Sequence, residues 1–334
     1  MWWEERCRVD GSFDQNTLNV TPETRKSISL LKQGSEEWLH ARYGRLTASN
    51  FGAAAGNHLP GARKKLLENM LWPEFAKLTG MAAKFAAYGT QHESVAREVY
   101  AADRQSRGNA CLRVFETGLL VSLEHGWLGS SPDFVVEECT AIHERPAGPL
   151  ANEHHSRQPY IISHPHGAAL FIKNTPACSG GPSSEEPHTI TQGCGEIKCP
   201  ATHTLYSRSE KHAVYGFPAY YYDQIQGIMA INNWPWCDTV VHTPHETEVI
   251  RFHANEAYWR EDLFPKLRRF YYEDFLPRLS LRIKGKLKRG EVDARLVIPS
   301  VVFELGLDLG VRDKKKRKRS TSERENMKTL TLKP

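Results

Sequence analysis

Glu196 and Lys198 stand two positions apart in the short apolar segment Gly195–Cys199. Side chains two residues apart on a β-strand project from the same face, so a strand here would hold a carboxylate and an ammonium side by side. A second carboxylate, Asp133, follows a Ser-Pro pair in another strand-like stretch. If the two strands are neighbours, Asp133 and Glu196 supply hard oxygen ligands for Mg²⁺ or Mn²⁺ beside the lysine. The pattern therefore requires a sheet that brings positions 133 and 196 together.

The composition is that of a soluble globular protein. The 334 residues are 40% hydrophobic and 25% charged, enough for one large domain or two small ones. The N-terminus carries acidic residues and no sustained apolar stretch, which argues against a secretory signal. No segment approaches the roughly 20 apolar residues of a membrane span. We expect a soluble, intracellular protein.

Basic residues gather near the C-terminus rather than over the whole chain. Six consecutive basic residues occupy 314–319, and the net charge of +5 leaves the rest of the chain close to neutral. Any surface that binds nucleic acid is therefore expected to be local. The basic run can act as a nuclear localisation signal, a DNA-gripping arm or a solvated tail, and its compactness favours the first and hence a nuclear location.

The seven cysteines are odd in number and irregularly spaced, with no CxxC pair. Cys194 and Cys199 flank the Glu-x-Lys segment, but an offset of five residues makes a poor zinc pair. Reduced thiols in a reducing compartment are the better interpretation.

The chain divides into one domain with flanking segments. We predict a polar N-terminal segment at 1–33, poorly ordered apart from its last few residues, a domain at 34–306, and a basic tail at 307–334. Residues 138–192 interrupt the domain and are rich in Pro, Gly, Ser and His. This insertion is expected to be largely disordered or a surface excursion. Its histidines, with Cys139 and Cys178, admit a zinc site, but their spacings match no standard finger and uncoordinated histidines are preferred.

Apolar periodicity and turn residues predict helices alternating with groups of strands. Helices are expected from Ser35, near 47–49, over 62–79 with a break at Pro73, and over 89–105, 219–233 and 255–276. Strands are expected at 111–121, 127–136, 195–199, 236–242 and 247–253. This order gives a mixed sheet with helices packed around it.

Five sequence blocks occur in one order along the chain. They are Gly34–Leu39 with Arg42 and Arg45–Ser49, Gly89–Glu93, Ser131–Asp133, Gly195–Pro200 and Tyr222–Gln226. Together they resemble the YqaJ-like viral recombinase and lambda exonuclease family of the PD-(D/E)xK nuclease superfamily, with the herpesvirus alkaline nucleases as distant relatives. The resemblance covers about residues 34–236, leaving aside 138–192.

The resemblance implies a fold and an activity. The fold is α/β, a restriction-endonuclease-like core in which helices flank a central mixed sheet. The activity is that of a Mg²⁺-dependent deoxyribonuclease, with Mn²⁺ as a possible substitute and two ions per site. Such an enzyme degrades one strand of linear double-stranded DNA in the 5′→3′ direction, in recombination, repair or viral DNA processing. A single-strand annealing protein as partner and a ring-shaped trimer are further implications.

The resemblance also assigns roles to single residues. The metal-binding set comprises three acids and one backbone carbonyl: Glu93, Asp133, Glu196 and Ile197. Asp133 and Glu196 also count among the catalytic residues, with Lys198 orienting or deprotonating the attacking water and Gln224 lying near it. Arg42 and Ser49 match residues that hold the 5′-terminal phosphate.

Elementary chemistry agrees with these roles. Cleaving a phosphodiester requires a nucleophile made from water and neutralisation of developing charge, and a divalent metal supplies both. A lysine near the metal is expected to have a depressed pKa and so accept a proton. Arginine suits a bidentate phosphate contact. Gln224 and Gln226 lie roughly 200° apart on a helix, so only one can face the site, and the resemblance selects Gln224.

Two departures from the family pattern concern the strand pair. In the family a short hairpin joins the two acids, whereas here 62 residues separate Asp133 from Glu196. An insertion at a hairpin tip need not disturb its strands, because loop-closure entropy grows slowly with length. Phe134 stands where a glycine is common, which is expected to alter the local backbone more than the chemistry.

Two alternatives remain open at this point. One is an endonuclease or an RNA-degrading nuclease on the same core, against which Arg42 and Ser49 argue because internal cutting needs no terminal-phosphate pocket. The other is a catalytically inactive DNA-binding recombination scaffold, against which the intact Asp133, Glu196 and Lys198 argue.

Overall fold

The protein is described here by a computed structural model covering residues 3–8, 12–107, 112–141, 160–163, 188–208 and 217–292. All of these residues belong to one compact unit, Met1–Leu296. The predicted tail at 307–334, its basic run and most of the insertion lie outside the described residues, so the predictions made for them stay predictions. Within the described part, no helix has the length and apolar character needed to cross a membrane.

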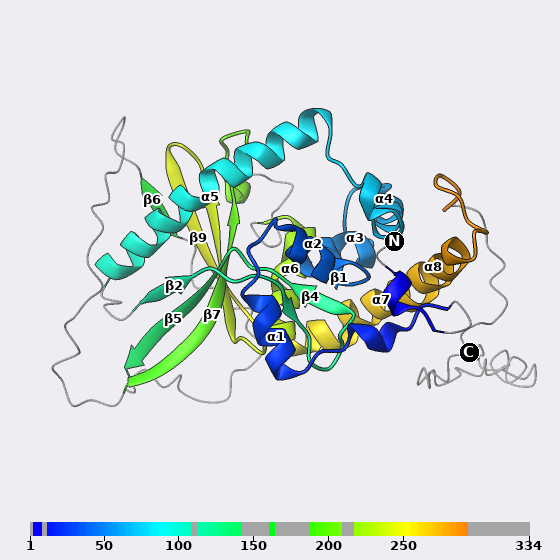
Figure 1. Ribbon diagram of the computed structural model, residues 1–334. Helices are drawn as coiled ribbons and strands as arrows, with labels where there is room; N and C mark the ends of the chain where they lie inside the picture. Colours follow the sequence, from blue (N-terminus) through cyan, green and yellow to red (C-terminus); the bar gives the residue numbers. More distant parts are fainter. Residues whose placement is uncertain are drawn as a thin grey trace, which may run out of the picture. The chain divides into compact units, whose positions relative to one another are not determined.

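A six-stranded mixed sheet forms the centre of the fold (Figure 1). Its strands, in spatial order, are β2 (Arg113–Phe115), β5 (Phe134–Ala141), β7 (His188–Lys198), β8 (Trp236–His242), β9 (Glu246–His253) and β6 (Tyr160–Ser163). Strands β7 and β8 are parallel and are joined through helix α6 (Ala219–Asn232), whereas the other neighbours are antiparallel. The predicted α/β class with a mixed sheet flanked by helices is confirmed.

A smaller sheet ends directly before the segment that leads to Asp133 in the sequence. It consists of β1 (Leu46–Thr47), β4 (Leu128–Ser130) and β3 (Leu120–Val121), with β1 parallel to β4. Because β4 ends at Ser130, this sheet delivers the Ser-Pro-Asp segment directly to the first residue of β5.

The large sheet separates two apolar cores. Ala96 and Tyr100 of helix α5 (Gly80–Ser106) pack with Phe134, Ile197 and Val240 on one face. The other face packs against α6, whose Ile225 and Ile228 meet Cys194, Cys237 and Val241. Since side chains alternate along a strand, Glu196 and Lys198 belong to the α6 face, with Cys194.

Local signals explain where most helices begin and end. The Ser35 hydroxyl accepts a hydrogen bond from the Trp38 N–H at 3.2 Å and starts α2 (Glu36–Arg42), as predicted. Helix α4 (Ala62–Leu71) ends before Pro73, which opens the short turn η4 (Pro73–Phe75), as predicted. The remaining short elements are η1 (Glu4–Arg6), η2 (Gln15–Leu18), η3 (Ala48–Asn50), α3 (Phe51–Ala55) and η5 (Tyr206–Arg208).

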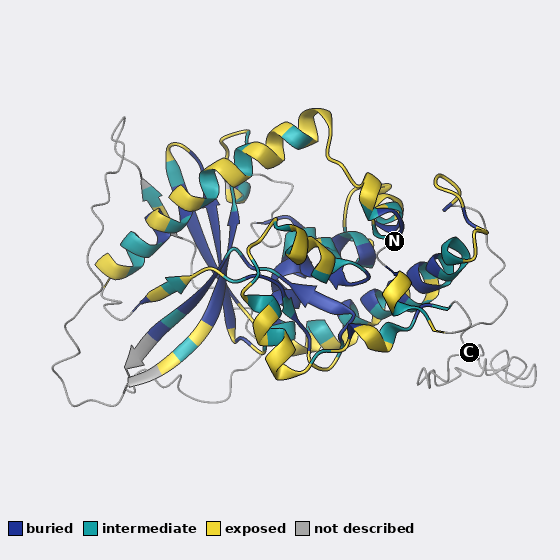
Figure 2. Cartoon of the chain, viewed as in Figure 1, coloured by how far each residue is buried: buried dark blue, intermediate teal, exposed yellow. Residues whose placement is uncertain are grey.

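Helix α5 is longer than predicted. It begins at Gly80 rather than Gly89, so Glu93 lies in the middle of a 27-residue helix and not near its start. The extra turns are rich in alanine, the residue with the best helix propensity. Only the second half contributes buried residues, Ala96, Val99 and Tyr100, and Figure 2 shows the first half largely exposed.

The predicted helix at 255–276 extends to Ile283 and changes character twice. Two π-helical turns, η7 (Tyr258–Leu263) and η8 (Phe270–Phe275), precede α7 (Phe264–Arg269) and α8 (Leu276–Ile283). Pro265 and Pro277 each stand at the second residue of the α-helical stretch that follows. Proline has no N–H to donate and its ring crowds the carbonyl four residues back, which a wider π turn relieves.

The expectation of a poorly ordered N-terminal segment was wrong. Residues 12–33 include α1 (Pro22–Ser29), capped by the Thr21 hydroxyl, and Trp3, Phe13 and Leu18 are buried in the main core. Three apolar anchors among polar neighbours carry no periodic signal, because the segment supplies only isolated side chains to a core built by the rest of the chain.

The insertion also differs from the prediction at its ends. Strand β5 runs on to Ala141 and β7 starts at His188, and the two pair without interruption from Phe134↔Gly195 to Ala141↔His188. Residues 160–163 add the edge strand β6 alongside β9. The long insertion therefore leaves the hairpin arms paired, as loop-closure entropy allows. The cluster of histidines proposed as a zinc alternative lies outside the described residues except for the backbone of His188.

Candidate active site

The sheet register brings Asp133 and Glu196 opposite each other. Phe134 pairs with Gly195, so the next opposed positions are 133 and 196, and their side chains share the α6 face. Oδ2 of Asp133 accepts a hydrogen bond from the Ile197 N–H at 2.5 Å. The two acids thus meet around the backbone of Ile197, across 62 residues of intervening sequence.

Phe134 shapes this junction without entering it. Its ring is fully buried, 5.0 Å from the ring of Tyr100, and lies directly over Gly195. A Cβ at position 195 would fall inside that ring, so glycine is required for the close approach. The departure at Phe134 is therefore matched by the glycine opposite.

Glu196 is buried, with 4% of its surface exposed, and only one of its oxygens is satisfied. Oε1 accepts from Lys198 Nζ at 2.7 Å and from Gln224 Nε2 at 2.5 Å. Oε2 is buried and has no hydrogen-bond partner among the described residues. A buried carboxylate oxygen without a partner costs free energy and fits a position where a metal ion binds.

Glu93 lies close enough to Glu196 and Asp133 for the charges of the carboxylates to interact. Burial and the charge of Glu196 raise the pKa of Glu93, although Lys198 and Arg97 oppose the shift. Burial and the charge of Glu196 also raise the pKa of Asp133 well above its ordinary value, with Glu93 contributing. Three mutually repelling carboxylates are stabilised by a divalent cation.

The oxygen atoms of Glu93, Asp133 and Glu196 are of the kind that binds a hard divalent ion, but the three side chains are not grouped around one point. No three Asp, Glu, His or Cys side chains in the described ranges are grouped closely enough to hold a metal. Asp133 Oδ2 is instead bonded to the Ile197 N–H, and Glu196 Oε1 is bonded to Lys198 and Gln224. Oε2 of Glu196, which has no hydrogen-bond partner among the described residues, would be available to a metal ion.

Without a metal ion, the surroundings of Lys198 raise its pKa. Burial alone lowers its pKa, but Glu196, Tyr221 and Asp133 outweigh burial and raise the pKa. The lysine is therefore a firmly held cation in the metal-free protein. The predicted depression concerns the metal-bound site and stays a prediction, whereas the neighbouring carboxylates set the direction where no metal is bound.

Gln224 and Gln226 point to different places from α6. The Gln224 amide bridges Glu196 and Lys198, accepting from Lys198 Nζ at 3.3 Å. Gln226 instead donates to the His253 carbonyl at 3.0 Å and accepts from the Asn255 N–H at 2.8 Å. The structure thus places Gln224 at the acids and gives Gln226 a connection between β9 and the following helix.

Tyr221 is a site residue that the sequence argument missed. Lys198 Nζ lies 4.4 Å from the centre of its ring, and a ring face attracts a cation. Its neighbour Tyr222 is buried in the core, whereas Tyr221 is only partly buried. Helical geometry offers a signal: Tyr221 precedes Gln224 by three residues and so shares its face.

We expect Tyr221→Leu to slow any reaction at this site by about 2- to 30-fold, because a cation–π contact of roughly 0.5–2 kcal/mol no longer holds Lys198. Tyr221→Phe keeps the ring and should retain most of the rate. Initial rates of the two variants, compared at equal metal concentration, check this. Equal rates for Leu and Phe would show that the ring does not position the lysine.

Arg42 lies in a setting suited to an anion. Its guanidinium stacks on Trp38 at 4.2 Å and donates to the Thr47 hydroxyl at 3.0 Å. No carboxylate pairs with it in the described part of the chain, and burial lowers its pKa to about 10. A half-buried cation without a counter-charge favours a phosphate as its missing partner.

Ser49 is exposed in the short turn η3 and its hydroxyl caps no helix. The structure therefore leaves this hydroxyl available at the start of α3. The Trp38 indole N–H reaches Ser131 Oγ at 3.3 Å and links the Arg42 helix to the segment that ends at Asp133.

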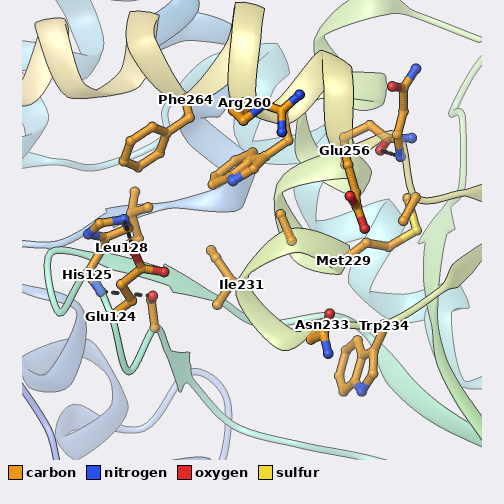
Figure 3. Close-up of a pocket in the computed structure, with 16 residues that line it drawn as sticks. Glu124, His125, Leu128, Met229, Ile231, Asn233, Trp234, Glu256, Arg260 and Phe264 are labelled. Carbon is orange, nitrogen blue, oxygen red and sulfur yellow. Dashed lines mark hydrogen bonds and ion pairs between the residues drawn. The ribbon is translucent and has the colours of Figure 1, made fainter.

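A cavity of about 450 Å³ lies elsewhere (Figure 3). It is bounded by the end of α6, the turn between β3 and β4, and the start of the helical region that follows β9. Trp234, Met229, His125 and Phe264 contribute to its lining, as does Gln226. None of the eight residues predicted for the site lines it, so this cavity is no part of the candidate site.

The comparisons with known proteins give the family of this chain. The family model of the YqaJ-like viral recombinase domain matches residues 37–235, more than half of the chain. The chain belongs to this family. The resemblance inferred from the five blocks is thereby confirmed.

Two solved structures are similar to this YqaJ-family chain, and no curated protein matches it. They are an alkaline exonuclease (LHK-Exo) from Laribacter hongkongensis and the complex of LHK-Exo with dAMP. Each has 20% sequence identity to this chain and a TM-score of 0.45, and covers 75% of this chain and 95% of its own.

Proposed function

We propose that this YqaJ-family protein is a metal-dependent deoxyribonuclease that degrades linear double-stranded DNA from the 5′ end. Family membership supports the broad assignment, a nuclease acting on DNA. The single observation that carries the metal-dependent assignment is the buried Oε2 of Glu196, which has no partner among the described residues and lies beside Asp133 and Lys198. A structural ion pair would satisfy both oxygens, whereas a metal site keeps one for the ion.

The side chains divide the work of hydrolysis. Asp133, Glu196, Glu93 and the Ile197 carbonyl would hold Mg²⁺ or Mn²⁺, in one or two positions. When bound, the metal neutralises charge on the phosphate and favours deprotonation of water. Lys198, held as a cation between Glu196 and Tyr221, is placed to orient the water and to stabilise the negative charge that develops.

Gln224 fixes the relative positions of these groups. Its amide donates to Glu196 and accepts from Lys198, so one side chain sets the spacing between carboxylate and ammonium. This fixed spacing matters because misplacement by about 1 Å can cost 10²-fold in rate.

Arg42 favours an exonuclease over an endonuclease. A partly buried guanidinium with no carboxylate partner among the described residues suits a terminal phosphate, which carries more charge than an internal one. The Trp38–Ser131 bond ties this subsite to Asp133. The proposed enzyme would hold the phosphorylated 5′ end at Arg42 while the neighbouring bond is cut.

Lys198→Ala is expected to lower the cleavage rate by about 10²- to 10⁴-fold while DNA binding is largely retained. The assay is digestion of end-labelled linear duplex DNA, with and without Mg²⁺, and electrophoretic measurement of DNA binding. Lys266→Ala is the matched control, because Lys266 is a half-exposed lysine paired with Asp262 on the protein surface. If wild type and Lys198→Ala digest DNA equally, the proposed site is wrong.

The same assay separates the alternatives. Preference for a 5′-phosphorylated linear duplex over a closed circle supports the exonuclease, and equal cutting of both supports an endonuclease. Digestion of RNA in place of DNA would support an RNA-degrading enzyme. Metal-dependent cleavage of any of them contradicts a catalytically inactive scaffold.

Three further proposals rest on the sequence, the first two on the family resemblance and the third on the compact basic run. They are a single-strand annealing protein as partner, a ring-shaped trimer, and entry into the nucleus directed by residues 314–319. Sedimentation of the purified chain tests the trimer, and localisation of a fluorescent fusion with and without the basic run tests the last.

A further inference from the structure

We propose that two residues of the N-terminal segment, Arg25 and Gln33, are positioning residues for Asp133. Both precede the family-matched region, which begins at residue 37. The inference rests on the proposed metal site and names which parts of this chain hold it in place. We call Arg25 and Gln33 the N-terminal bracket.

Gln33 acts on the residue directly before Asp133. Its side-chain N–H group donates to the Pro132 carbonyl at 3.0 Å and to the Thr117 carbonyl at 2.9 Å. The amide nitrogen of Gln33 carries two hydrogens, and each is donated to one of these carbonyls. Thr117 is itself attached to the N-terminal segment, because its neighbour Gly118 donates its N–H to the Ser29 carbonyl at 2.7 Å.

Arg25 acts on the same segment through Asn232. Its guanidinium donates to Asn232 Oδ1 at 2.6 Å, and Asn232 Nδ2 donates to Ser130 Oγ at 3.0 Å. Asn232 is the last residue of α6, the helix that also carries Gln224. Arg25 therefore fixes the end of that helix and, through it, the start of the Ser-Pro-Asp segment.

With Trp38, which bonds Ser131, these contacts restrain three consecutive residues before Asp133. Ser130 is held from Asn232, Ser131 from Trp38 and Pro132 from Gln33. Asp133 follows at once, in a turn outside the regular pairing of β5, so its own backbone has little sheet support. Supporting contacts of this kind orient a metal ligand and are typically worth 10- to 100-fold in metal affinity.

The test measures metal binding directly, without DNA. Mn²⁺ is titrated into the full chain and free Mn²⁺ is followed by electron paramagnetic resonance, for wild type, Gln33→Leu and Arg25→Met. We expect the dissociation constant for Mn²⁺ to rise by about 10-fold in each variant. Gln105→Leu, an exposed glutamine near the end of α5, is the matched control and should bind as wild type does.

A second readout separates positioning from general loss of structure. The cleavage rate of Gln33→Leu, measured against Mn²⁺ concentration, should approach the wild-type rate at saturating Mn²⁺, since only the affinity for metal is reduced. An unchanged Mn²⁺ affinity in both variants overturns the inference while leaving the proposed function intact. A lower rate that saturating metal does not restore also overturns it, because the segment then supports the fold only. Absence of Mn²⁺ binding and of cleavage in wild type overturns the proposed function itself.

Discussion

Asp133→Asn is expected to abolish the response of the protein to Mg²⁺ and to lower DNA cleavage by about 10³-fold or more. Asparagine keeps the shape of the side chain and an oxygen that accepts from the Ile197 N–H, so the local bond at this position survives. What is lost is one negative charge of the set that binds the metal. Thermal unfolding with Mg²⁺ and with a chelator measures the response.

The same substitution should stabilise the metal-free protein. The pKa of Asp133 is raised by burial and by Glu196, so the carboxyl favours the folded state only while it is protonated, and that contribution is lost as the pH rises. Where the carboxyl is ionised, it repels Glu196 and Glu93. Removing such a functional charge is worth about 0.5–2 kcal/mol.

The two effects have opposite signs, which makes the experiment sharp. In the chelator Asp133→Asn should unfold at a temperature equal to or above that of wild type. With Mg²⁺ at 100 times its dissociation constant, wild type gains about 2.7 kcal/mol and the variant gains none. Asp262→Asn, a half-exposed surface acid paired with Lys266, is the control and should follow wild type throughout. A variant that Mg²⁺ still stabilises would remove Asp133 from the ligand set.

Much of the candidate site was predictable because several of its residues lie only two positions apart in the sequence, and such a spacing fixes which side chains can share a face. Glu196 and Lys198 share a face wherever their segment is a strand, and Gln224 and Gln226 must diverge on any helix. The pairing of Asp133 with Glu196 across 62 residues followed from the family resemblance, and the register bears out the placement. The charges around each group do not follow from spacing, so the raised pKa of Lys198 in the absence of metal could not be predicted from the sequence.

The N-terminal segment was missed for a different reason. Its contributions are single anchors, such as Leu18, and side-chain bonds to carbonyls of distant residues. Buried Arg45 illustrates this, because its guanidinium donates to the carbonyls of Gly126 and Leu18 at 2.9 and 2.7 Å. Composition and periodicity describe a segment on its own and contain no information about such partners.

A buried charge cluster on the opposite face of the sheet was also invisible in the sequence. Arg251 on β9 bonds Asp238 on β8 through Nε and Nη2, each at 2.7 Å, and bonds Glu138 on β5 at 2.6 Å. Tyr100 of α5 donates to Asp238 at 2.7 Å, and Arg104 bonds Glu138. Strand positions far apart in sequence meet here under the helix that carries Glu93.

Arg251→Met is expected to lower the free energy of unfolding by about 3–5 kcal/mol, because two buried carboxylates lose their shared counter-charge. Glu138 keeps Arg104, but Asp238, with 1% of its surface exposed, keeps only the Tyr100 hydroxyl among the described residues. Adding Asp238→Asn to Arg251→Met should recover part of the loss, since the orphaned charge is then removed as well. Urea unfolding of the single and double variants measures both values.

Arg113→Met provides the matched control for Arg251→Met. Arg113 and Glu137 are cross-strand partners at 2.9 Å in the same sheet, as Arg251 and Asp238 are, but the Arg113 side chain is 76% exposed. An exposed pair of this kind contributes about 0–1 kcal/mol, so the control isolates burial as the cause.

Because Tyr100 and Arg104 attach α5 to this cluster, Arg251→Met should also weaken Mn²⁺ binding at Glu93. A variant with full stability would mean that water or movement of α5 satisfies both carboxylates, and the cluster would then have no part in holding the helix.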